Sequence, residues 1–336
     1  MELIPTEVFK TYWSFAAERQ SVYFNRLKFR LGPWTKDGIL NQYRFTNSYR
    51  AADRVSQYLI SEIQYHPTRS KRPEEVFFRT ILFKIFNKID TWEAIEAANK
   101  RPINLQNVDY DLIAKTLSGI MDRGIPVYSA AYIMPSPKFG HKRKFENHLA
   151  LIKTMLEDSL PDRLRQRPTL GDVYKMLLSY PGLGPFLAFQ YTIDLNYSEM
   201  LDFDENDFVV AGPGAIDGIS KCFHNYRDFK PENIIHHVTQ NQDKYLKDYG
   251  VDFRTLFGRK LKPIDCQNLF CEISKYSRVA HPEISGISGR TRIKQTYKPA
   301  SKQLSKPYFP ERWGLNANVD DFMAEQLLTD SLKMHS

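Results

Sequence analysis

The sequence predicts a mainly α-helical protein, and three observations support that fold class. Apolar residues recur at helical spacing along most of the 336-residue chain, and the alternating stretches that a sizeable sheet needs are missing. A Pro-Gly-x-Gly hairpin at residues 179–190 joins two apolar helices. Residues 128–134 are the one stretch that suits a short strand. We therefore expect helices to form the core.

Helices are expected wherever apolar residues repeat every three or four positions between turn signals. Asn47 suits the N-cap of one of them, and Thr169-Leu-Gly-Asp172 has the form of a capping box with Asp in place of Glu. The connections between residues 223 and 265 are interpreted as irregular, and the C-terminal segment as an amphipathic helix or a loosely attached tail. The expected helices span residues 8–24, 48–65, 75–86, 91–98, 110–122, 148–157, 170–179, 185–195, 216–223, 265–278 and 316–333.

The hairpin, reading SYPGLGPFLAFQ, is the most informative stretch of the chain. Gly182 and Gly184 allow positive φ and a close approach of the backbone to a ligand, and Pro185 suits the first turn of the second helix. The free amides there and the positive end of the helix dipole form an anion site. In a basic protein the obvious anion is a DNA phosphate. The alternative is a tight turn between two core helices.

The charge distribution also favours a polyanionic partner. Lys and Arg number 47 against 39 Asp and Glu, which gives a net charge of +8. Two segments carry basic residues and no acid, and such segments either contact phosphates or form solvated surface loops. The first, residues 135–145, holds Lys138, Lys142, Arg143 and Lys144; the second, residues 284–306, holds Arg290, Arg292, Lys294, Lys298, Lys302 and Lys306.

The chain as a whole indicates a soluble, intracellular protein. It has no run of eighteen apolar residues and no signal-peptide pattern at its N-terminus. Cys222, Cys266 and Cys271 lack metal-ligand spacing, so we expect buried thiols rather than disulfides or a zinc site. We expect a helical domain of two lobes over residues 1–283, followed by a flexible basic arm and tail over 284–336.

A second glycine-rich segment, GPGAIDGISK at residues 212–221, resembles a phosphate-binding loop only weakly. It lacks the GK[ST] ending and does not follow a convincing strand, so it gives little support to a nucleotide kinase. A second phosphate clamp, or a tight turn that shapes a base pocket, fits better.

Two rows of polar side chains accompany these segments. Residues 47, 50 and 54 lie three to four positions apart, and so do Asp265, Asn268, Glu272 and Lys275 on one face of the helix expected over 265–278. Such rows suit recognition of a polar base or sugar. They suit an interhelical salt-bridge network equally well, and both interpretations stay open here.

Four segments taken in order resemble a known family. They read FTNSYRAADRVSQYL (45–59), YPGLGPFLAFQYTIDLNYS (180–198), DFVVAGPGAIDGISK (207–221) and DCQNLFCEISKY (265–276). The chain resembles, over roughly residues 40–280, the helical domain associated with 5-hydroxymethyl-deoxyuridine DNA kinases and alpha-glutamyl/putrescinyl thymine pyrophosphorylases. That family is distantly related to helix-hairpin-helix DNA glycosylases. The resemblance implies a glycosylase-like helical fold with a cleft between helical lobes.

The family contains more than one activity. Some phage members are implicated in hypermodifying thymine, and a related bacterial protein removes glucosylated hydroxymethylcytosine from phage DNA. Since no kinase domain or good nucleotide-binding loop is apparent, we expect the glycosylase branch. The chain would hydrolyse the N-glycosidic bond of a hydroxymethylated or glucosylated pyrimidine in anti-phage defence, as a cytoplasmic monomer. Because Pro185-Phe186-Leu187 has no lysine, it would be monofunctional and leave abasic sites.

Two other classes of function remain as alternatives. One is a transferase that replaces an activated group on hydroxymethyl-deoxyuridine with an amine. The other is a non-enzymatic module that recognises modified DNA. The resemblance also allows a monovalent cation held by hairpin carbonyls, and otherwise no metal or cofactor.

The resemblance implies roles for residues along the chain. Six carboxylates lie between residues 194 and 207, and we expect Asp207, then Asp204 or Asp217, to activate water and stabilise a cationic sugar. A flipped base would be read or stacked upon by Asn47, Tyr49, Arg50, Asn268, Glu272 and Tyr276. DNA phosphates would be bound by Gly182, Gly184, Phe186, Lys138, Lys142, Arg143, Lys144, Arg290 and Arg292.

Overall fold

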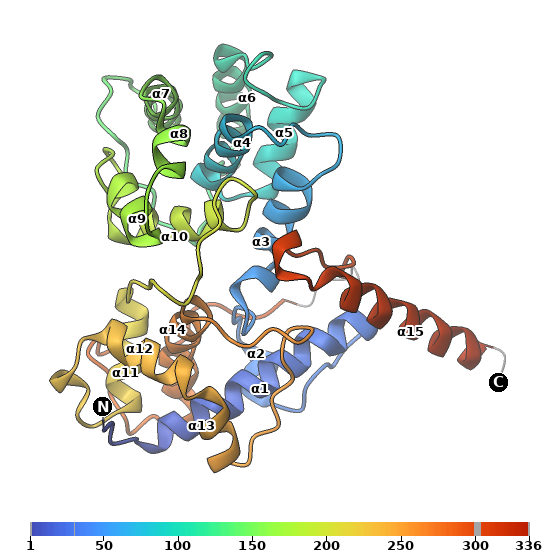
Figure 1. Ribbon diagram of the computed structural model, residues 1–336, viewed down its shortest axis with the longest axis vertical. Coiled ribbons are helices and arrows are strands. Elements are labelled where there is room, and N and C mark those ends of the chain that lie inside the picture. The colour runs from blue at the N-terminus through green and yellow to red at the C-terminus, as the bar shows by residue number, and fades with distance from the viewer. Residues whose placement is uncertain (1, 30, 299–303, 335–336) are drawn as a thin grey trace. The chain divides into compact units, whose positions relative to one another are not determined.

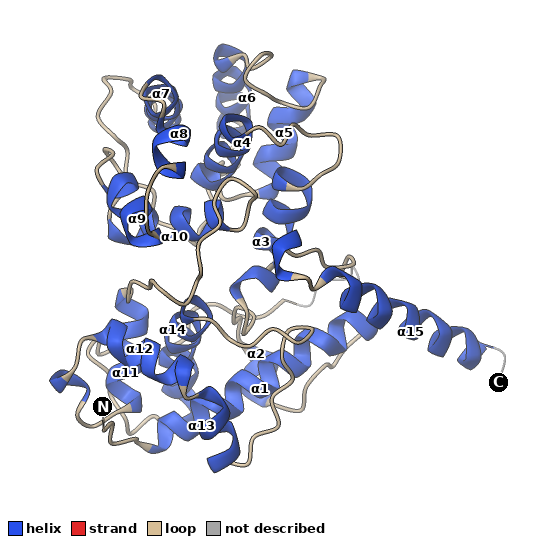
Figure 2. Cartoon of the chain, viewed as in Figure 1, coloured by secondary structure: helices blue, strands red, loops and turns tan. Residues whose placement is uncertain are grey.

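The protein is mainly helical, as the sequence predicts (Figures 1 and 2). The computed structural model describes residues 2–29, 31–298 and 304–334. Across these ranges the only β pairing consists of isolated bridges, and the strand expected at 128–134 is a loop. In the described part of the chain, no helix combines the length and apolar character that a membrane crossing needs.

The chain forms two compact units, which are described separately. Unit 1 comprises residues 1–53 and 205–336, and unit 2 is the continuous segment 54–204. The elements of unit 1 are α1 (Glu7–Lys28), α2 (Gly38–Gln42), η1 (Arg50–Ala52), α11 (Pro213–Cys222), η3 (Tyr226–Asp228), α12 (Pro231–Gln240), α13 (Gln242–Asp248), α14 (Pro263–Ala280), η4 (Glu311–Trp313) and α15 (Asn316–Met334). Those of unit 2 are α3 (Arg54–Tyr58), η2 (Leu59–Gln64), α4 (Pro73–Phe86), α5 (Ile89–Asn99), α6 (Tyr110–Asp122), α7 (Lys144–Glu157), α8 (Leu160–Arg165), α9 (Leu170–Leu178) and α10 (Pro185–Asn196).

Unit 1 is built around α14, which packs against α1, α11 and α12. The contact with α11 is very close, because a Cβ placed on Gly218 would lie 1.9 Å from the carbonyl oxygen of Phe270. Aromatic rings fill the space between α1 and its neighbours: the ring centroid of Phe9 lies 4.5 Å from that of Phe223, and that of Tyr12 lies 4.7 Å from that of Phe270. Apolar burial of this kind is the main source of stability for the unit.

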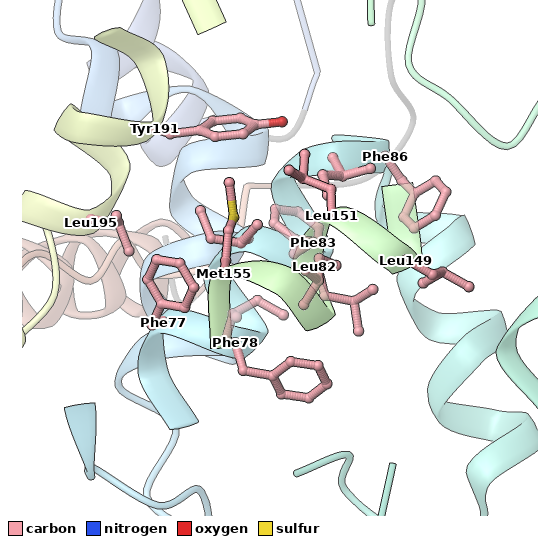
Figure 3. Packing of buried hydrophobic residues seen from close by; sticks show 14 of the residues in the cluster. Phe77, Phe78, Leu82, Phe83, Phe86, Leu149, Leu151, Met155, Tyr191 and Leu195 are labelled. Atoms are coloured by element: carbon pink, nitrogen blue, oxygen red, sulfur yellow. The ribbon is translucent and has the colours of Figure 1, made fainter. Parts of the chain in front are cut away.

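Unit 2 is built around α4, which is buried along almost its whole length. It packs against α5, α7, α8 and α10, and the aromatic and aliphatic side chains in Figure 3 fill the space between these helices. Phe77, Phe78 and Phe83 are each at most 1% exposed. The hairpin helices α9 and α10 belong to this unit and pack against each other.

Local signals explain which elements the sequence predicts well. The Thr169 hydroxyl accepts from the amide of Asp172 and donates to its carboxylate, which confirms the capping box before α9.

The helix expected over 48–65 is instead split into η1, α3 and the π-helix η2. Its expected cap, Asn47, donates its side-chain amide to the carbonyl of Ala52. The connections between residues 223 and 265, interpreted as irregular, contain α12 and α13.

The three cysteines are free thiols, as expected. Cys222 and Cys266 are buried in unit 1, and burial raises the pKa of Cys266 and of Cys271 to about 12. All three therefore act as small apolar groups at neutral pH rather than as reactive thiolates.

Candidate functional site

The hairpin between α9 and α10 has the backbone geometry that its glycines predict. The amide of Leu183 donates to the carbonyl of Tyr180 at 3.2 Å and closes the turn. Gly182 takes φ of +84°, a conformation that residues with a Cβ rarely adopt. A Cβ there would also meet the ring of Pro137 at 3.2 Å. Gly182 is thus required both by the turn and by the close approach of residues 135–145.

The second hairpin helix begins with an open N-terminus. Gly184 is the N-cap, Pro185 is the first helical residue, and the first helical hydrogen bond runs from the amide of Ala188 to the carbonyl of Gly184 at 3.0 Å. The Gly184 cap has no side chain to occupy the amides ahead of that bond, and the space around it is open. Together with the helix dipole, these amides can bind an anion. The phosphate role of Gly182, Gly184 and Phe186 stays a prediction.

A loop of residues 123–143 lies beside the hairpin and carries the predicted basic side chains. Lys138, Lys142 and Arg143 are exposed, as is Lys144 at the start of α7. The segment 123–145 contains no acidic residue. Arg143 lies 3.6 Å from Asp122 on α6, a pair exposed enough to contribute little to stability. The basic residues are therefore exposed to solvent, and Lys138 directly follows Pro137, which contacts Gly182 of the hairpin.

Buried side chains hold the 123–143 loop in place. The hydroxyl of Tyr128 and Nδ1 of His148 are 2.8 Å apart, and Nε2 of His148 lies 2.9 Å from the carbonyl oxygen of Pro135. Since a carbonyl can only accept, Nε2 carries the proton and Nδ1 accepts from the tyrosine. Burial lowers the pKa of His148 to about 4, so the ring is neutral at pH 7.

Asn147 supplies a second anchor for the same loop. Its side-chain oxygen accepts from the amides of Phe139 and His141, at 3.0 and 3.2 Å, and its side-chain nitrogen donates to the carbonyl of His141 at 2.9 Å. The hydroxyl of Thr91 donates to the carbonyl of Val127 at 2.9 Å. The loop thus has a defined conformation without regular secondary structure.

A buried ion pair within unit 2 joins α4 to the hairpin helix α10. Nζ of Lys84 is 3.2 Å from a carboxylate oxygen of Asp194 on α10, and it donates to Oδ1 of Asn87 at 2.6 Å. It also lies 5.2 Å from the ring centroid of Tyr132, whose hydroxyl donates to Gln190. Asp194, one of the six carboxylates noted in the sequence, is thus a fully buried partner of Lys84.

A network of polar groups in unit 1 joins residues 46–53 to α14. The carboxylate of Glu272 accepts from the amide of Thr46 at 3.1 Å, and Asn268 donates to the Thr46 hydroxyl at 2.9 Å and to the carbonyl of Asn47 at 3.2 Å. Nζ of Lys275 lies 2.6 Å from Glu272. The polar row on α14 therefore binds the segment that carries Asn47, through the backbone amide and hydroxyl of Thr46 and the carbonyl of Asn47.

Two carboxylates of this network lie away from solvent: Asp265 is buried and Asp53 is partly buried. Asp265 accepts from the amides of Arg50 and Lys262, at 2.9 and 3.0 Å, and Asp53 accepts from the amide of Asn47 at 2.8 Å. Burial raises the pKa of Asp265 and of Asp53 to about 6 in each case, although these hydrogen bonds oppose the shift. Perturbed carboxylates gathered in this way are typical of functional sites, although structural networks also produce them.

Helix α1 contributes two buried polar side chains that the sequence analysis missed. Arg19 is 8% exposed, its Nη1 has no hydrogen-bond partner, and burial lowers its pKa to about 10. Gln20 is fully buried, and both polar atoms of its amide lack a partner. Buried polar groups of this kind need a reason, such as a bound water or ligand. The sequence does contain a signal for their burial, because Arg19 and Gln20 lie at helical spacing from the apolar residues Ala16 and Tyr23.

The predicted base-binding aromatics lie in different environments. Tyr49 is 1% exposed and donates its hydroxyl to the carbonyl of Arg259 at 2.6 Å, so its ring belongs to the core and is not placed to stack on a base. Tyr276 is half-buried, donates to Asp37 at 2.6 Å and has its ring centroid 5.0 Å from that of Phe15. Neither ring is presented as a free face.

The predicted catalytic carboxylates also differ from one another. Asp204 and Asp207 are exposed, whereas Asp217 is buried on α11. The two oxygens of Asp217 accept from the hydroxyl of Ser274 at 2.5 Å and from the amide of Ser288 at 2.6 Å, and these bonds lower its pKa against the effect of burial. Asp217 therefore fixes the segment after α14 to α11.

The glycine-rich segment 212–221 is the helix α11 and its N-cap, not a phosphate-binding loop. Gly214 lies against Cys271 and Gly218 against Phe270, so these glycines permit close packing of α11 on α14. Lys221 at its end is buried and donates to the carbonyl of Ser274 at 3.1 Å. The two uses predicted for this segment, a phosphate clamp and a turn that shapes a base pocket, stay predictions.

The basic segment 284–306 is partly attached to unit 1. The amide of Arg44 donates to the carbonyl of Gln295 at 3.0 Å, and the amide of Tyr297 donates to the carbonyl of Gln42 at 2.9 Å. Arg290 and Arg292 have exposed side chains, and the predicted residue Lys302 lies outside the described residues. Across the described ranges, no three His, Cys, Asp or Glu side chains converge to hold a metal ion.

Comparisons with known proteins show what this chain is similar to. Residues 6–286 match the family described as "5-hmdU DNA kinase, helical domain". A protein of Bacillus phage SP10 named "5-hmdU DNA kinase" is 23% identical over 285 residues, which cover 79% of this chain and 44% of that protein. The chain thus spans less than half the length of this relative. No solved structure matches the chain.

These matches correct the predicted activity. A kinase is a transferase, so the relative is named for group transfer and not for hydrolysis of a glycosidic bond. The prediction of a monofunctional DNA glycosylase is therefore wrong, and the catalytic acids proposed for it lose their basis. The missing lysine after the hairpin and the lack of a nucleotide-binding loop did not discriminate between the branches of the family. Because the match spans most of the chain, the protein belongs to the family of the 5-hmdU DNA kinase helical domain.

Proposed function

We propose that the chain binds double-stranded DNA containing 5-hydroxymethyl-deoxyuridine and acts as a transferase on the 5-hydroxymethyl group of that base. The observation that carries the proposal is the family match over residues 6–286, which includes the hairpin, the 123–143 loop and the polar network on α14. The relative's name supplies the base and the class of reaction. The N-glycosidic bond stays intact in such a reaction.

Unit 2 is suited to hold the DNA backbone. The N-terminus of α10 presents free amides, and the neighbouring loop carries the exposed side chains of Lys138, Lys142 and Arg143 in a segment, 123–145, that contains no acidic residue. Backbone amides and basic side chains position DNA without reading its sequence. These groups of unit 2 support a DNA partner. Recognition of the modified base must then come from other residues.

The polar network of unit 1 is the part that we assign to the modified base. Glu272 is 5% exposed, while Asn268 and Lys275 are partly exposed, so the network reaches solvent along one side of α14. A hydroxymethyl group both donates and accepts hydrogen bonds, and so can a side-chain amide such as that of Asn268. Asn268 donates to the Thr46 hydroxyl and to the carbonyl of Asn47. A site built to satisfy that hydroxyl would reject thymine, because thymine would leave its polar groups unpaired.

The test uses the purified chain with duplexes that differ only in one base, 5-hydroxymethyl-deoxyuridine or thymidine. Each is incubated with ATP or GTP, digested to nucleosides and analysed by mass spectrometry, while anisotropy measures binding. We expect tighter binding to the modified duplex and a mass increase of the modified nucleoside. Lys275→Ala is expected to lower both, and Lys10→Ala, a change at an exposed residue of α1, to alter neither. Equal binding and no mass change would contradict the proposal.

A second candidate is a module that recognises modified DNA and carries out no reaction. It is favoured by the fact that the polar groups of the network largely bind one another. It predicts selective, salt-dependent binding without any change of nucleoside mass. The same experiment therefore separates the two candidates.

A further inference from the structure

Two large apolar side chains are exposed at the hairpin surface of unit 2. Ile133, in the 123–143 loop, is 90% exposed, and Phe186, the second residue of α10, is 40% exposed. The segments that carry them are in contact, since the ring of Tyr132, the residue before Ile133, meets that of Phe186 edge-on with centroids 5.2 Å apart. A single exposed apolar residue is ordinary, but two on contacting segments beside a binding surface indicate an interaction site.

The chain around Ile133 is firmly anchored. The next residue, Met134, is 5% exposed and its sulfur accepts from the hydroxyl of Tyr191 at 3.8 Å. The carbonyl of Pro135 is bound by His148, and the amide of Ser129 donates to the carbonyl of Phe86 at 2.8 Å. Ile133 thus projects from a fixed backbone, with anchors on both sides. The fold holds an apolar side chain in water at a defined position.

The surroundings of this pair favour a polyanion as the occupant. The segments 123–145 and 173–193, which form the loop and the hairpin, contain no Asp or Glu. Lys138, Lys142 and Arg143 are exposed on the loop. A second copy of the chain would present the same basic surface and be repelled. DNA offers what the surface requires, which is two rows of phosphates with apolar base faces between them.

We infer that Ile133, supported by Tyr132 and Phe186, inserts between neighbouring base pairs when the hairpin binds DNA. The inference takes its DNA partner from the proposed function. It adds how the base stack of the duplex is opened. Apolar side chains inserted at a base step unstack it and kink the duplex, and the cost is offset by contacts that the bent DNA allows. The insertion would unstack a base step and so lower the cost of extruding the modified base from the duplex.

The experiment uses the full chain and a duplex with 2-aminopurine next to 5-hydroxymethyl-deoxyuridine, because 2-aminopurine fluoresces more strongly when it is unstacked. Saturating wild-type protein is expected to raise the fluorescence. Ile133→Ala should lose most of that rise and bind up to roughly tenfold more weakly. Ile133→Leu should restore it. Lys142→Ala should weaken binding and leave the rise at saturation unchanged.

Ile125→Ala is the matched control, because Ile125 is 44% exposed in the same loop. It should bind and unstack DNA as the wild type does. Binding by the wild type without any rise, or a full rise with Ile133→Ala, would overturn the insertion alone and leave the proposed function standing. Failure of the wild type to bind DNA would overturn both.

Discussion

Gly218 sets the distance between the two helices that form the centre of unit 1. A Cβ at this position would lie 1.9 Å from the carbonyl oxygen of Phe270, and backbone on a neighbouring helix cannot rotate aside. Gly286 is similarly confined, since a Cβ there would lie 2.4 Å from the carboxylate of Asp217. Both glycines are thus needed for the close approach of chain segments.

Gly218→Ala is therefore expected to destabilise the protein by about 3 kcal/mol or more, because α11 and α14 must separate to admit the methyl group. Urea unfolding followed by circular dichroism measures the change. Gly38→Ala is the control, since the space around Gly38 within unit 1 is open and its φ is not positive. Equal stability of the two variants would contradict the close contact.

Single residues also show why the sequence was a poor guide to the site. The glycines of 212–221 were linked to phosphate binding because glycine lets backbone approach a ligand, and it lets backbone approach another helix for the same reason. The row of Asn268 and Glu272 allowed both base recognition and a network between segments, and the structure shows the network. Whether such a row recognises a base or binds another segment depends on partners distant in sequence, such as Thr46. No local sequence pattern identifies those partners.

Among the elements, the 123–143 loop depends on side chains from the helix that follows it. His148 and Asn147, both on α7, bind five backbone groups of the loop between residues 135 and 143. A stretch of this length without regular structure needs such anchors to satisfy its backbone groups. The conformation of the loop is therefore linked to the protonation of one histidine.

This link predicts a pH dependence. The pKa of His148 is about 4 in the folded protein and about 6.5 when unfolded. Below pH 6.5 the unfolded chain takes up a proton that the folded one excludes, so its contribution to stability is present above pH 6.5 and is lost as the pH falls towards 4. The wild type should lose about 2 kcal/mol between pH 7 and pH 5 from this group.

Urea unfolding of the wild type and of His148→Gln at both pH values measures the effect. The glutamine amide can donate to Pro135 and accept from Tyr128 but does not titrate in this range. The difference in unfolding free energy between the two proteins should therefore shrink at pH 5, since other titrating groups are common to both. A pH-independent difference would show that His148 has the same pKa in the folded and unfolded states.

Elements with strong local signals were predicted closely. The helix over 110–122 follows Asp109, whose carboxylate accepts from the amides of Asp111 and Leu112, and the hairpin helix starts at Pro185 as expected. α12 was missed although Pro231 starts it, because only four of its residues are buried and the apolar signal is short. The π-helical turn of η2 has no sequence signature that periodicity can detect.

For the whole molecule, the charge distribution determines how DNA binding responds to salt. The logarithm of the association constant should fall linearly with the logarithm of salt concentration, with a slope of about −0.9 per phosphate contact. If Lys142 and Arg143 each contact one phosphate, the double change to alanine should reduce the slope by about 2.

The salt series is measured by anisotropy on the modified duplex. Lys115→Ala is the control, because Lys115 is exposed on α6 outside the 123–143 loop, and its slope should equal that of the wild type. An unchanged slope in the double variant would place the DNA elsewhere on the chain.

At this scale the sequence predicted the helical class but not the division into units. Unit 1 combines residues 1–53 with residues 205–336, and the contacts that unite them, such as those between α1, α11 and α14, join segments far apart in the chain. Periodicity and caps are local and contain no information on such contacts. The functional branch of the family was likewise decided by comparison with a relative rather than by any residue.

The discontinuity of unit 1 has a consequence for synthesis on the ribosome. Residues 54–204 leave the exit tunnel as one uninterrupted stretch and can fold as soon as they emerge. The nascent α1 is made before them, yet its partners α11 and α14 are translated only afterwards. Its aromatic stripe of Phe9, Tyr12 and Trp13 therefore remains without its native cover while all of unit 2 is being translated. During that interval the stripe is a natural binding site for chaperones, and a translational pause before residue 263 would prolong the exposure.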